Sequence, residues 1–169
     1  VGMSLSVLLA QHSDVMVLDL DEERVDKINN RKSTVSDNEI ELFLAERSLS
    51  LSATLCKQDA YEGASFIVVA TPTNYDLDTN CFDTSSVDYV VQDALSINQH
   101  ALVIIKSTIP VGHARSLQEK FQTDRVIFSP EFLREGQALK DNLYPSRIIM
   151  GGECNKARDF ASLLSQGAI

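Results

Sequence analysis

The sequence predicts an α/β fold, a doubly wound parallel sheet covered by helices, and two observations lead to this prediction. Short apolar runs alternate along the chain with segments whose apolar residues recur at the period of a helix. The runs are almost continuously apolar, which is typical of strands buried on both faces. Strands and helices that alternate in this way build a parallel sheet. The predicted strands are residues 15–20, 51–54, 66–70, 101–108, 126–130 and 147–152.

The helices between these strands are predicted from charge order, periodicity and capping residues. Residues 21–30 carry acids in the first turn and basic residues later, the order that a helix dipole favours. Residues 37–47 have an amphipathic pattern, and two serines are expected to cap a helix over residues 85–97. The remaining expectations are a helical turn at 60–63, helices at 113–121 and 156–166, and a polar loop at 71–86.

The composition of the 169 residues is that of one ordinary folded domain, with 44% apolar and 23% charged residues. A net charge of −9 and scattered basic residues argue against binding to nucleic acid or to an anionic membrane. Cys56, Cys81 and Cys154 are odd in number and far apart, so they fit neither a disulfide framework nor a zinc site. We expect reduced thiols that serve as small packing residues in a cytoplasmic protein, and, because the three histidines are also isolated, no metal.

The first twenty residues have the spacing of the second half of a Rossmann-type dinucleotide-binding unit. Gly2 precedes a predicted helix and a strand that ends at Asp19, where an acid would accept hydrogen bonds from a ribose. The first strand and the first two glycines of such a unit would lie before residue 1. We therefore expect residues 1–169 to be a partial domain, truncated at both ends. The alternative is a chance glycine with Asp19 as an ordinary helix cap.

Polar segments follow several predicted strands, and the carboxyl ends of parallel strands meet at one edge where ligands bind. The segments are Asp19, residues 71–73, residues 106–108 and residues 129–135.

Four motifs together resemble the UDP-glucose 6-dehydrogenase family, in the family's order and over the whole chain. They are Asp19 with Arg24, TPT at 71–73, KSTIPVG at 106–112 and SPEFLREG at 129–136. The resemblance implies two successive NAD-dependent oxidations that convert UDP-glucose to UDP-glucuronate, in a cytoplasmic homodimer that supplies polysaccharide biosynthesis. The family's nucleophilic cysteine lies in a C-terminal half, and no cysteine here matches its motif, so residues 1–169 alone are expected to be inactive.

Three alternatives compete with this interpretation, one within the same family and two from other functional classes. A related dehydrogenase acting on GDP-mannose or a UDP-N-acetyl sugar has the same arrangement of motifs, although the sequence FLREG favours UDP-glucose. A non-catalytic nucleotide-sensing module would explain the sheet and Asp19, but it would not explain the acids of SPEFLREG. A structural or interaction domain would leave the polar strand ends unexplained.

The resemblance implies a set of NAD-binding residues. Val1 and Gly2 match the end of the pyrophosphate turn, and Asp19 matches the acid on the adenosine ribose, which would repel the 2′-phosphate of NADP. Arg24 matches a basic residue beside that ribose, with a solvated helix charge as the alternative. Thr71 matches a contact near the nicotinamide, with a hydroxyl that closes the Thr-Pro turn as the alternative.

The resemblance also implies catalytic and substrate-binding residues. Thr108 matches a threonine that positions the catalytic water and contacts the cofactor, and Glu131 matches the acid–base group of thioester hydrolysis. Glu135 matches a residue at the nicotinamide end, and Lys106 is as well explained by a structural role. The alternative for the two acids is one face of a short helix. The residues implied along the UDP-sugar are Glu131, Phe132, Leu133, Arg134 and Glu135.

Overall fold

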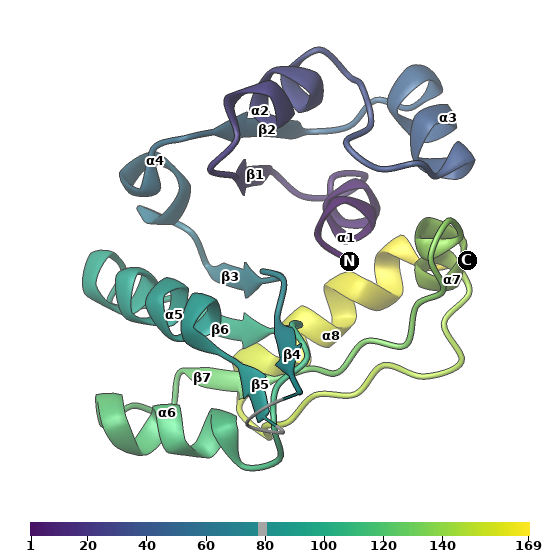
Figure 1. Cartoon of the computed structure of the whole chain (residues 1–169). Helices are drawn as coiled ribbons and strands as arrows, with labels where there is room; N and C mark the ends of the chain where they lie inside the picture. Colours follow the sequence, from purple (N-terminus) through teal and green to yellow (C-terminus); the bar gives the residue numbers. More distant parts are fainter. Residues whose placement is uncertain (78–80) are drawn as a thin grey trace. The chain divides into compact units, whose positions relative to one another are not determined.

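The structure is a computed structural model that describes residues 1–77 and 81–169 (Figure 1). The chain forms two compact units, which are described separately. The first unit contains Val1–Ala60, Phe132–Ile148 and Asp159–Ile169, and the second contains Tyr61–Glu131 and Ile149–Arg158.

The first unit is built on two parallel strands, β1 (Val15–Leu18) and β2 (Leu51–Thr54). Its helices are α1 (Gly2–Leu9), α2 (Glu22–Asn29), α3 (Asn38–Glu46) and α7 (Ala138–Leu143). The predicted strands and helices over residues 15–54 are confirmed within one or two residues at each end. Asp21 caps α2 by accepting a hydrogen bond from the Glu23 amide, which is why this helix begins where the acids do.

Helix α7 was not predicted, because its six residues are too few to show a periodic pattern. It is held instead by Asp37, a buried residue far away in the sequence. One carboxylate oxygen of Asp37 caps α3, and the other accepts a hydrogen bond from the Leu139 amide in the first turn of α7. Tertiary contact therefore replaces intrinsic propensity at this short helix.

The second unit is built on a three-stranded parallel sheet in the order β3–β6–β7. Its strands are β3 (Phe66–Val69), β6 (Leu102–Ile105) and β7 (Val126–Phe128). Helix α5 (Ser85–Ile97) contacts β3 and β6, and α6 (His113–Phe121) contacts β7. All four residues of β6 are buried, because this strand has a neighbour on each side. The parallel α/β architecture predicted from the sequence is confirmed.

Two helices have residues in both units. Helix α4 (Lys57–Tyr61) begins three residues before the predicted helical turn, and α8 (Asn155–Gly167) covers the predicted closing helix.

The prediction of a polar loop over residues 71–86 is wrong. Strands β4 (Asn74–Asp76) and β5 (Cys81–Asp83) form an antiparallel hairpin in which Tyr75 pairs with Phe82. The two rings lie edge to face, with centroids 5.1 Å apart. Cross-strand aromatic pairs stabilise hairpins, and this pair outweighs the polar composition around it.

The prediction of serine caps at the start of α5 is also wrong. The residue at the cap position is Thr84, which makes no side-chain cap bond, and the Ser85 amide donates to Asp83 Oδ1 at 3.0 Å. The carboxylate of Asp83, at the end of β5, therefore accepts the capping hydrogen bond that was predicted for the serines. The Ser86 side chain contacts other groups instead.

Residues 147–152 do not form the predicted strand. This segment contacts β7 through one backbone hydrogen bond, from the Gly151 amide to the Phe128 carbonyl at 2.7 Å. A Cβ at Gly151 would lie 2.6 Å from that carbonyl oxygen, so only glycine permits the approach. Residues 147–152 are apolar like a strand, but they do not form the ladder of backbone hydrogen bonds that defines one.

Asn98, which ends α5, joins three parts of the second unit through one buried side chain. Its amide nitrogen donates to the carbonyls of Tyr61 and Ala64, at 2.7 and 2.9 Å. Its amide oxygen accepts from the backbone N–H groups of His100 and Ala101. This amide satisfies the backbone that leads into β6, where no helix or strand does so.

Candidate functional site at the carboxyl edges of the sheets

The three strands of the second unit end together, at Val69, Ile105 and Phe128, which are mutual partners in the parallel register. The residues that follow these ends come from the predicted motifs. They include Thr71 after β3, Lys106 to Thr108 after β6, and Glu131 after β7. The structure therefore places these three motifs at one edge of one sheet, as the sequence predicted.

A buried ion pair joins two of the motifs at this edge. Lys106 Nζ lies 2.9 Å from Glu131 Oε2, and both side chains are largely removed from solvent. Lys106 therefore has a partner within the site, and the ion pair fixes the position of the Glu131 carboxylate beside the strand ends.

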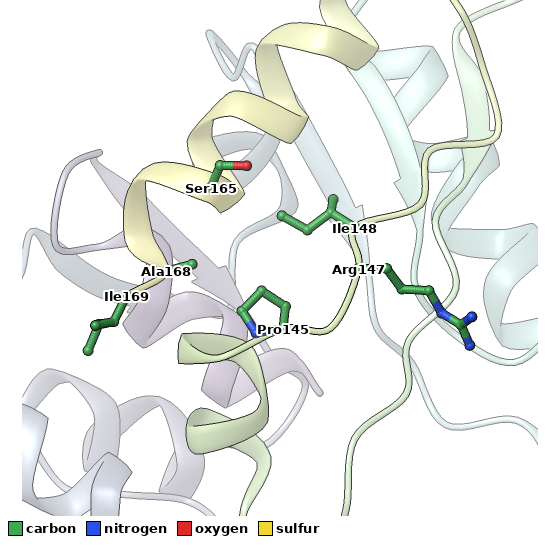
Figure 2. Close-up of a pocket in the computed structure, with 6 residues that line it drawn as sticks. All are labelled: Pro145, Arg147, Ile148, Ser165, Ala168 and Ile169. Carbon is green, nitrogen blue, oxygen red and sulfur yellow. The ribbon is translucent and has the colours of Figure 1, made fainter.

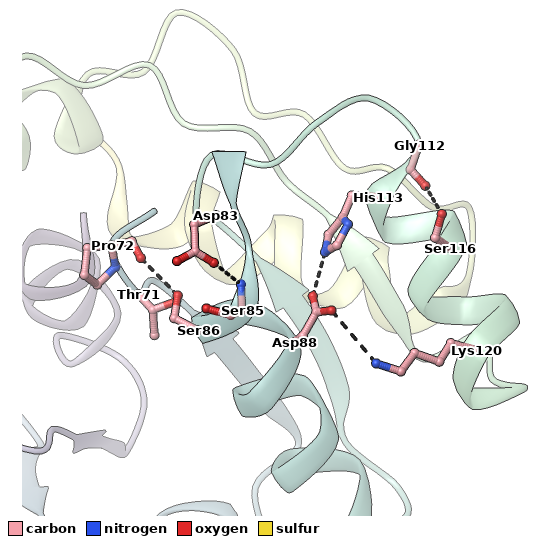
Figure 3. Close-up of polar contacts among 10 residues, drawn as sticks. All are labelled: Thr71, Pro72, Asp83, Ser85, Ser86, Asp88, Gly112, His113, Ser116 and Lys120. Atoms are coloured by element: carbon pink, nitrogen blue, oxygen red, sulfur yellow. Dashed lines mark hydrogen bonds and ion pairs between the residues drawn. The ribbon is translucent and has the colours of Figure 1, made fainter. Parts of the chain in front are cut away.

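Thr71 is held at the same edge by Ser107 and Ser86, of which Figure 3 shows Ser86. Ser107 Oγ donates to the Thr71 carbonyl at 2.6 Å, and Ser86 Oγ lies 3.1 Å from Thr71 Oγ1. Ser86 Oγ also lies 3.0 Å from the Pro72 carbonyl oxygen. The Thr-Pro turn is thus fixed from β6 on one side and from α5 on the other.

Thr108 is exposed and follows the buried Ser107 directly. The chain leaves the sheet at this point, so the Thr108 side chain is accessible to a ligand at the edge. The loop ends at Gly112, whose positive φ of 87° is accessible to glycine at little cost, and α6 begins at the next residue.

The loop that follows Thr108 is anchored by a pair that the sequence analysis did not single out. His113, the first residue of α6, lies 2.7 Å from Asp88 Oδ1 in the first turn of α5 (Figure 3). Lys120 Nζ lies 3.9 Å from the other oxygen of Asp88. Neither residue type is unusual at its position, so the sequence carried no signal for this contact.

Asp19 lies directly after β1 in the first unit, at the carboxyl end of the strand, as predicted. Its Oδ1 accepts a hydrogen bond from the Asp21 amide at 3.1 Å, and its Oδ2 pairs with Arg24 at 3.3 Å. A carboxylate has about four lone-pair sites, so each oxygen keeps one site that can accept a further donor. The geometry is compatible with two neighbouring hydroxyl groups.

Val1 and Gly2 lie at the start of α1. Gly2 is the first helical residue, and Val1, at the cap position, provides no side-chain cap bond. The amides of the first turn of a helix are suited to an anion when no side chain caps them.

The segment Phe132–Glu135 is not helical, so the alternative of two acids on one helix face is excluded. Arg134 is tied to Asp141 of α7 by three hydrogen bonds, from its amide, its Nε and its Nη2, at 2.9, 3.1 and 2.6 Å. These hydrogen bonds lower the pKa of Asp141 to about 2. Phe132 is held by the Arg147 guanidinium, 4.7 Å from its ring centroid, while Leu133 is half-buried and Glu135 is exposed.

A pocket in the first unit lies beside this segment but contains none of the predicted site residues. Figure 2 shows its lining. The lining residues are Pro145, Arg147, Ile148, Ser165, Ala168 and Ile169. Arg147 links the pocket to Phe132, and the polar strand ends lie elsewhere in their units.

The packing role predicted for the cysteines is wrong for two of them. Cys56 and Cys154 are exposed, because each lies at the start of a helix on the surface, where its carbonyl accepts from the first turn. The side chain of Cys81 lies outside the described residues. Across residues 1–77 and 81–169, no three His, Cys, Asp or Glu side chains gather as a metal site would require. In the same part of the chain, no helix is both long and apolar enough to cross a membrane.

Parallel strands with acids and hydroxyls at their carboxyl ends define an α/β nucleotide-binding domain of the dehydrogenase type. Comparison with protein families makes this specific. Residues 1–166 match the NAD-binding domain of the UDP-glucose/GDP-mannose dehydrogenase family, and the chain belongs to this family.

Individual relatives agree with the family assignment. The chain is 50% identical to UDP-glucose 6-dehydrogenase of Streptococcus pneumoniae, over the whole chain and 44% of that protein. It is 46% identical to UDP-glucose 6-dehydrogenase of Campylobacter jejuni, over 89% of the chain and 39% of that protein. The chain thus spans about two fifths of the length of the curated relatives it matches.

Solved structures show the same fold. A GDP-mannose dehydrogenase from Pseudomonas aeruginosa superimposes with a TM-score of 0.85 at 20% identity, over 99% of this chain and 42% of that one. A UDP-glucose dehydrogenase from Pyrobaculum islandicum also gives a TM-score of 0.85, at 24% identity and with the same coverage.

Proposed function

We propose that residues 1–169 are the NAD-binding portion of a UDP-glucose 6-dehydrogenase, which oxidises UDP-glucose to UDP-glucuronate with two NAD+. The buried Lys106–Glu131 pair is the observation that carries the proposal, because a purely nucleotide-sensing domain needs no buried acid–base group at the strand ends. The 50% identity to the Streptococcus pneumoniae enzyme supports UDP-glucose over the sister substrates.

The residues present fit NAD. The remaining lone pairs of Asp19 suit the two hydroxyls of the adenosine ribose, with Arg24 beside them, and the uncapped first turn at Val1 and Gly2 suits the pyrophosphate. Thr71, Thr108 and Glu135 complete the proposed cofactor contacts. NAD+, when bound, accepts the hydride released from the alcohol carbon.

Glu131 is proposed to hold and transfer the proton of the water that cleaves the thioester. Lys106 holds the Glu131 carboxylate in place, and Thr108 orients the water from its exposed position after β6. The segment Phe132–Glu135 is proposed to lie along the UDP-sugar. Its Arg134 is already engaged by Asp141, so this segment would meet the substrate in a preformed conformation.

The experiment is an assay of the full-length polypeptide for NADH formation. We expect two NADH per UDP-glucose, with GDP-mannose and UDP-N-acetylglucosamine giving rates at least tenfold lower. Glu131→Gln should lower turnover roughly 100-fold or more while NAD affinity stays within twofold, because general acid–base catalysis contributes about 10²–10⁴-fold. Turnover with a sister sugar alone would overturn the choice of substrate, and unchanged turnover in Glu131→Gln would remove this residue from the mechanism.

The proposal includes the wider setting that the family resemblance implied. The complete protein would be a cytoplasmic homodimer that supplies UDP-glucuronate for polysaccharide biosynthesis, with residues 1–169 as a partial NAD-binding domain. Light scattering of the full-length polypeptide tests the dimer, and a monomer at micromolar concentration would contradict it.

A further inference from the structure

Ser86 makes two contacts with the Thr-Pro turn, and its hydroxyl has only one proton. Its Oγ lies 3.0 Å from the Pro72 carbonyl oxygen and 3.1 Å from Thr71 Oγ1 (Figure 3). A carbonyl oxygen can only accept a hydrogen bond, whereas a threonine hydroxyl can also donate one. Both contacts are therefore satisfied together only when Ser86 donates to Pro72 and Thr71 donates to Ser86.

This assignment fixes the polarity of the Thr71 hydroxyl. With its proton directed to Ser86, the oxygen of Thr71 has lone pairs left and no proton for a ligand. The orientation is reinforced from the sheet, because Ser107 Oγ donates to the Thr71 carbonyl at 2.6 Å and holds the main chain of the same residue. Thr71 is only half-buried, so part of this residue is exposed at the edge of the sheet.

A threonine that can only accept selects the group it meets. Phosphate oxygens are acceptors and would gain no hydrogen bond there, whereas ribose hydroxyls and a carboxamide NH₂ are donors. We infer that Ser86 is a positioning residue of the NAD site, which turns the Thr71 hydroxyl into an acceptor for a hydrogen-bond donor of the cofactor. The inference rests on the proposed function for the identity of the ligand, and it adds a residue outside the four motifs of the sequence analysis.

Ser86 lies in the first turn of α5, where its side chain is available to position Thr71. The Asp83 carboxylate already binds the first amide of this helix, so the Ser86 side chain is not needed as a cap. Two residues further on, Asp88 binds His113 at the start of α6. The first turn of α5 thus contacts both loops that leave the neighbouring strands β3 and β6, and Ser86 is its contact with the Thr71 loop.

The test is a calorimetric titration of the full-length polypeptide with NAD, which needs no substrate and no turnover. Ser86→Ala should raise the Kd for NAD roughly 2- to 12-fold, the range that corresponds to one net hydrogen bond. Ser86→Thr keeps the hydroxyl and should bind NAD within twofold of the unchanged protein. Ser96→Ala is the matched control, because Ser96 lies on the same helix and its hydroxyl donates to the Asp93 carbonyl.

A double-variant cycle separates positioning from a general effect on the helix. In a Thr71→Val background, Ser86→Ala should change the Kd no further, because Ser86 acts through the hydroxyl that has been removed. An equal loss in both backgrounds, or a Kd for Ser86→Ala within twofold of the original, would overturn the inference. NAD binding by Thr71→Val at full affinity would overturn it as well.

The outcomes also distinguish this inference from the proposed function. If the unchanged polypeptide binds NAD but does not oxidise UDP-glucose, the proposed reaction fails and the cycle still tests Ser86. If it oxidises UDP-glucose and the Ser86 variants bind NAD normally, only the inference about Ser86 fails.

Discussion

Each unit has one ion pair at a strand end, and the two pairs differ in their surroundings. Lys106 and Glu131 lie 2.9 Å apart with side chains only 6% and 15% exposed. Arg24 and Asp19 lie 3.3 Å apart with side chains 47% and 25% exposed. Water screens the second pair and leaves it free to exchange partners, whereas the first pair is bound to its own partner. The buried pair therefore holds its carboxylate in place, whereas the carboxylate of the exposed pair stays accessible to solvent.

The strands beneath the two pairs differ in the same direction. Strand β6 has a hydrogen-bonded neighbour on each side and all four of its residues are buried. Strand β1 pairs in the described part of the chain with β2 alone, and Met16 on it is 44% exposed. A parallel strand becomes fully buried only when neighbours and helices cover it completely.

The largest expected effect is on the buried pair. Lys106→Met should lower the free energy of unfolding by about 3–5 kcal/mol, because it leaves Glu131 as a buried charge without its cationic partner. Urea denaturation of the full-length polypeptide measures the change. Lys120→Met, which removes an exposed partner of Asp88, is the control and should cost less than about 1 kcal/mol. Equal losses in the two variants would erase the contrast between buried and exposed pairs.

Truncating a side chain should lower the free energy of unfolding more in β6 than in β1. Ile104→Ala in β6 should cost about 2–5 kcal/mol, because it opens a cavity in a fully buried strand. Met16→Ala in β1 should cost less than about 1 kcal/mol, since much of that side chain is already in water. The same denaturation experiment measures both. A loss at Met16 as large as that at Ile104 would contradict this difference between the two strands.

Lowering the pH should reduce the contribution of the Arg134–Asp141 pair to stability. The pKa of Asp141 is lowered to about 2 from 3.8, so its contribution to stability is present above the unfolded value and is lost as the pH falls toward 2. The difference in Tm between the unchanged protein and Asp141→Asn should be constant above about pH 5 and shrink below about pH 4. Arg134→Met should remove the same pH dependence. A difference in Tm that does not vary with pH would show that the pair contributes through packing alone.

The smallest effect on stability is expected at the exposed pair. Arg24→Met should change the free energy of unfolding by less than about 1 kcal/mol. Asp19→Asn should instead act on the ligand, weakening NAD binding on the order of tenfold and reducing discrimination against NADP. Titrations with both nucleotides measure this. Unchanged affinities for the two would leave Asp19 with its local role alone, accepting from the Asp21 amide.

The sequence was most informative where local pattern and global fold agree. Residues 113–121 were predicted as a helix to the residue, because their periodicity lies between a glycine with positive φ and a positively charged last turn. The motifs at Thr71, Lys106 and Glu131 were also placed correctly, since strand ends in a parallel sheet share an edge. The partnership of Lys106 with Glu131 was not predicted, because the 24 residues between them carry no pairing signal.

The errors share a physical cause. The β4–β5 hairpin depends on a contact between two rings, α7 depends on the Asp37 carboxylate, and residues 147–152 depend on a glycine against the Phe128 carbonyl. Each is decided by a partner distant in sequence, and composition within a window of ten residues contains no information about that partner. The contacts of Ser86 with Thr71 and of Asp141 with Arg134 were not predicted for the same reason.

The hydrogen bonds of Asn98 restrict which side chain can occupy this position. The two carbonyl oxygens that it binds require a donor, and the two amides require an acceptor on the same planar group. Aspartate has the same shape, but it would direct a negative oxygen at two carbonyl dipoles. Deamidation of Asn98 to aspartate, a reaction that occurs as proteins age, would therefore destabilise the second unit. It would change the mass by only about one atomic mass unit.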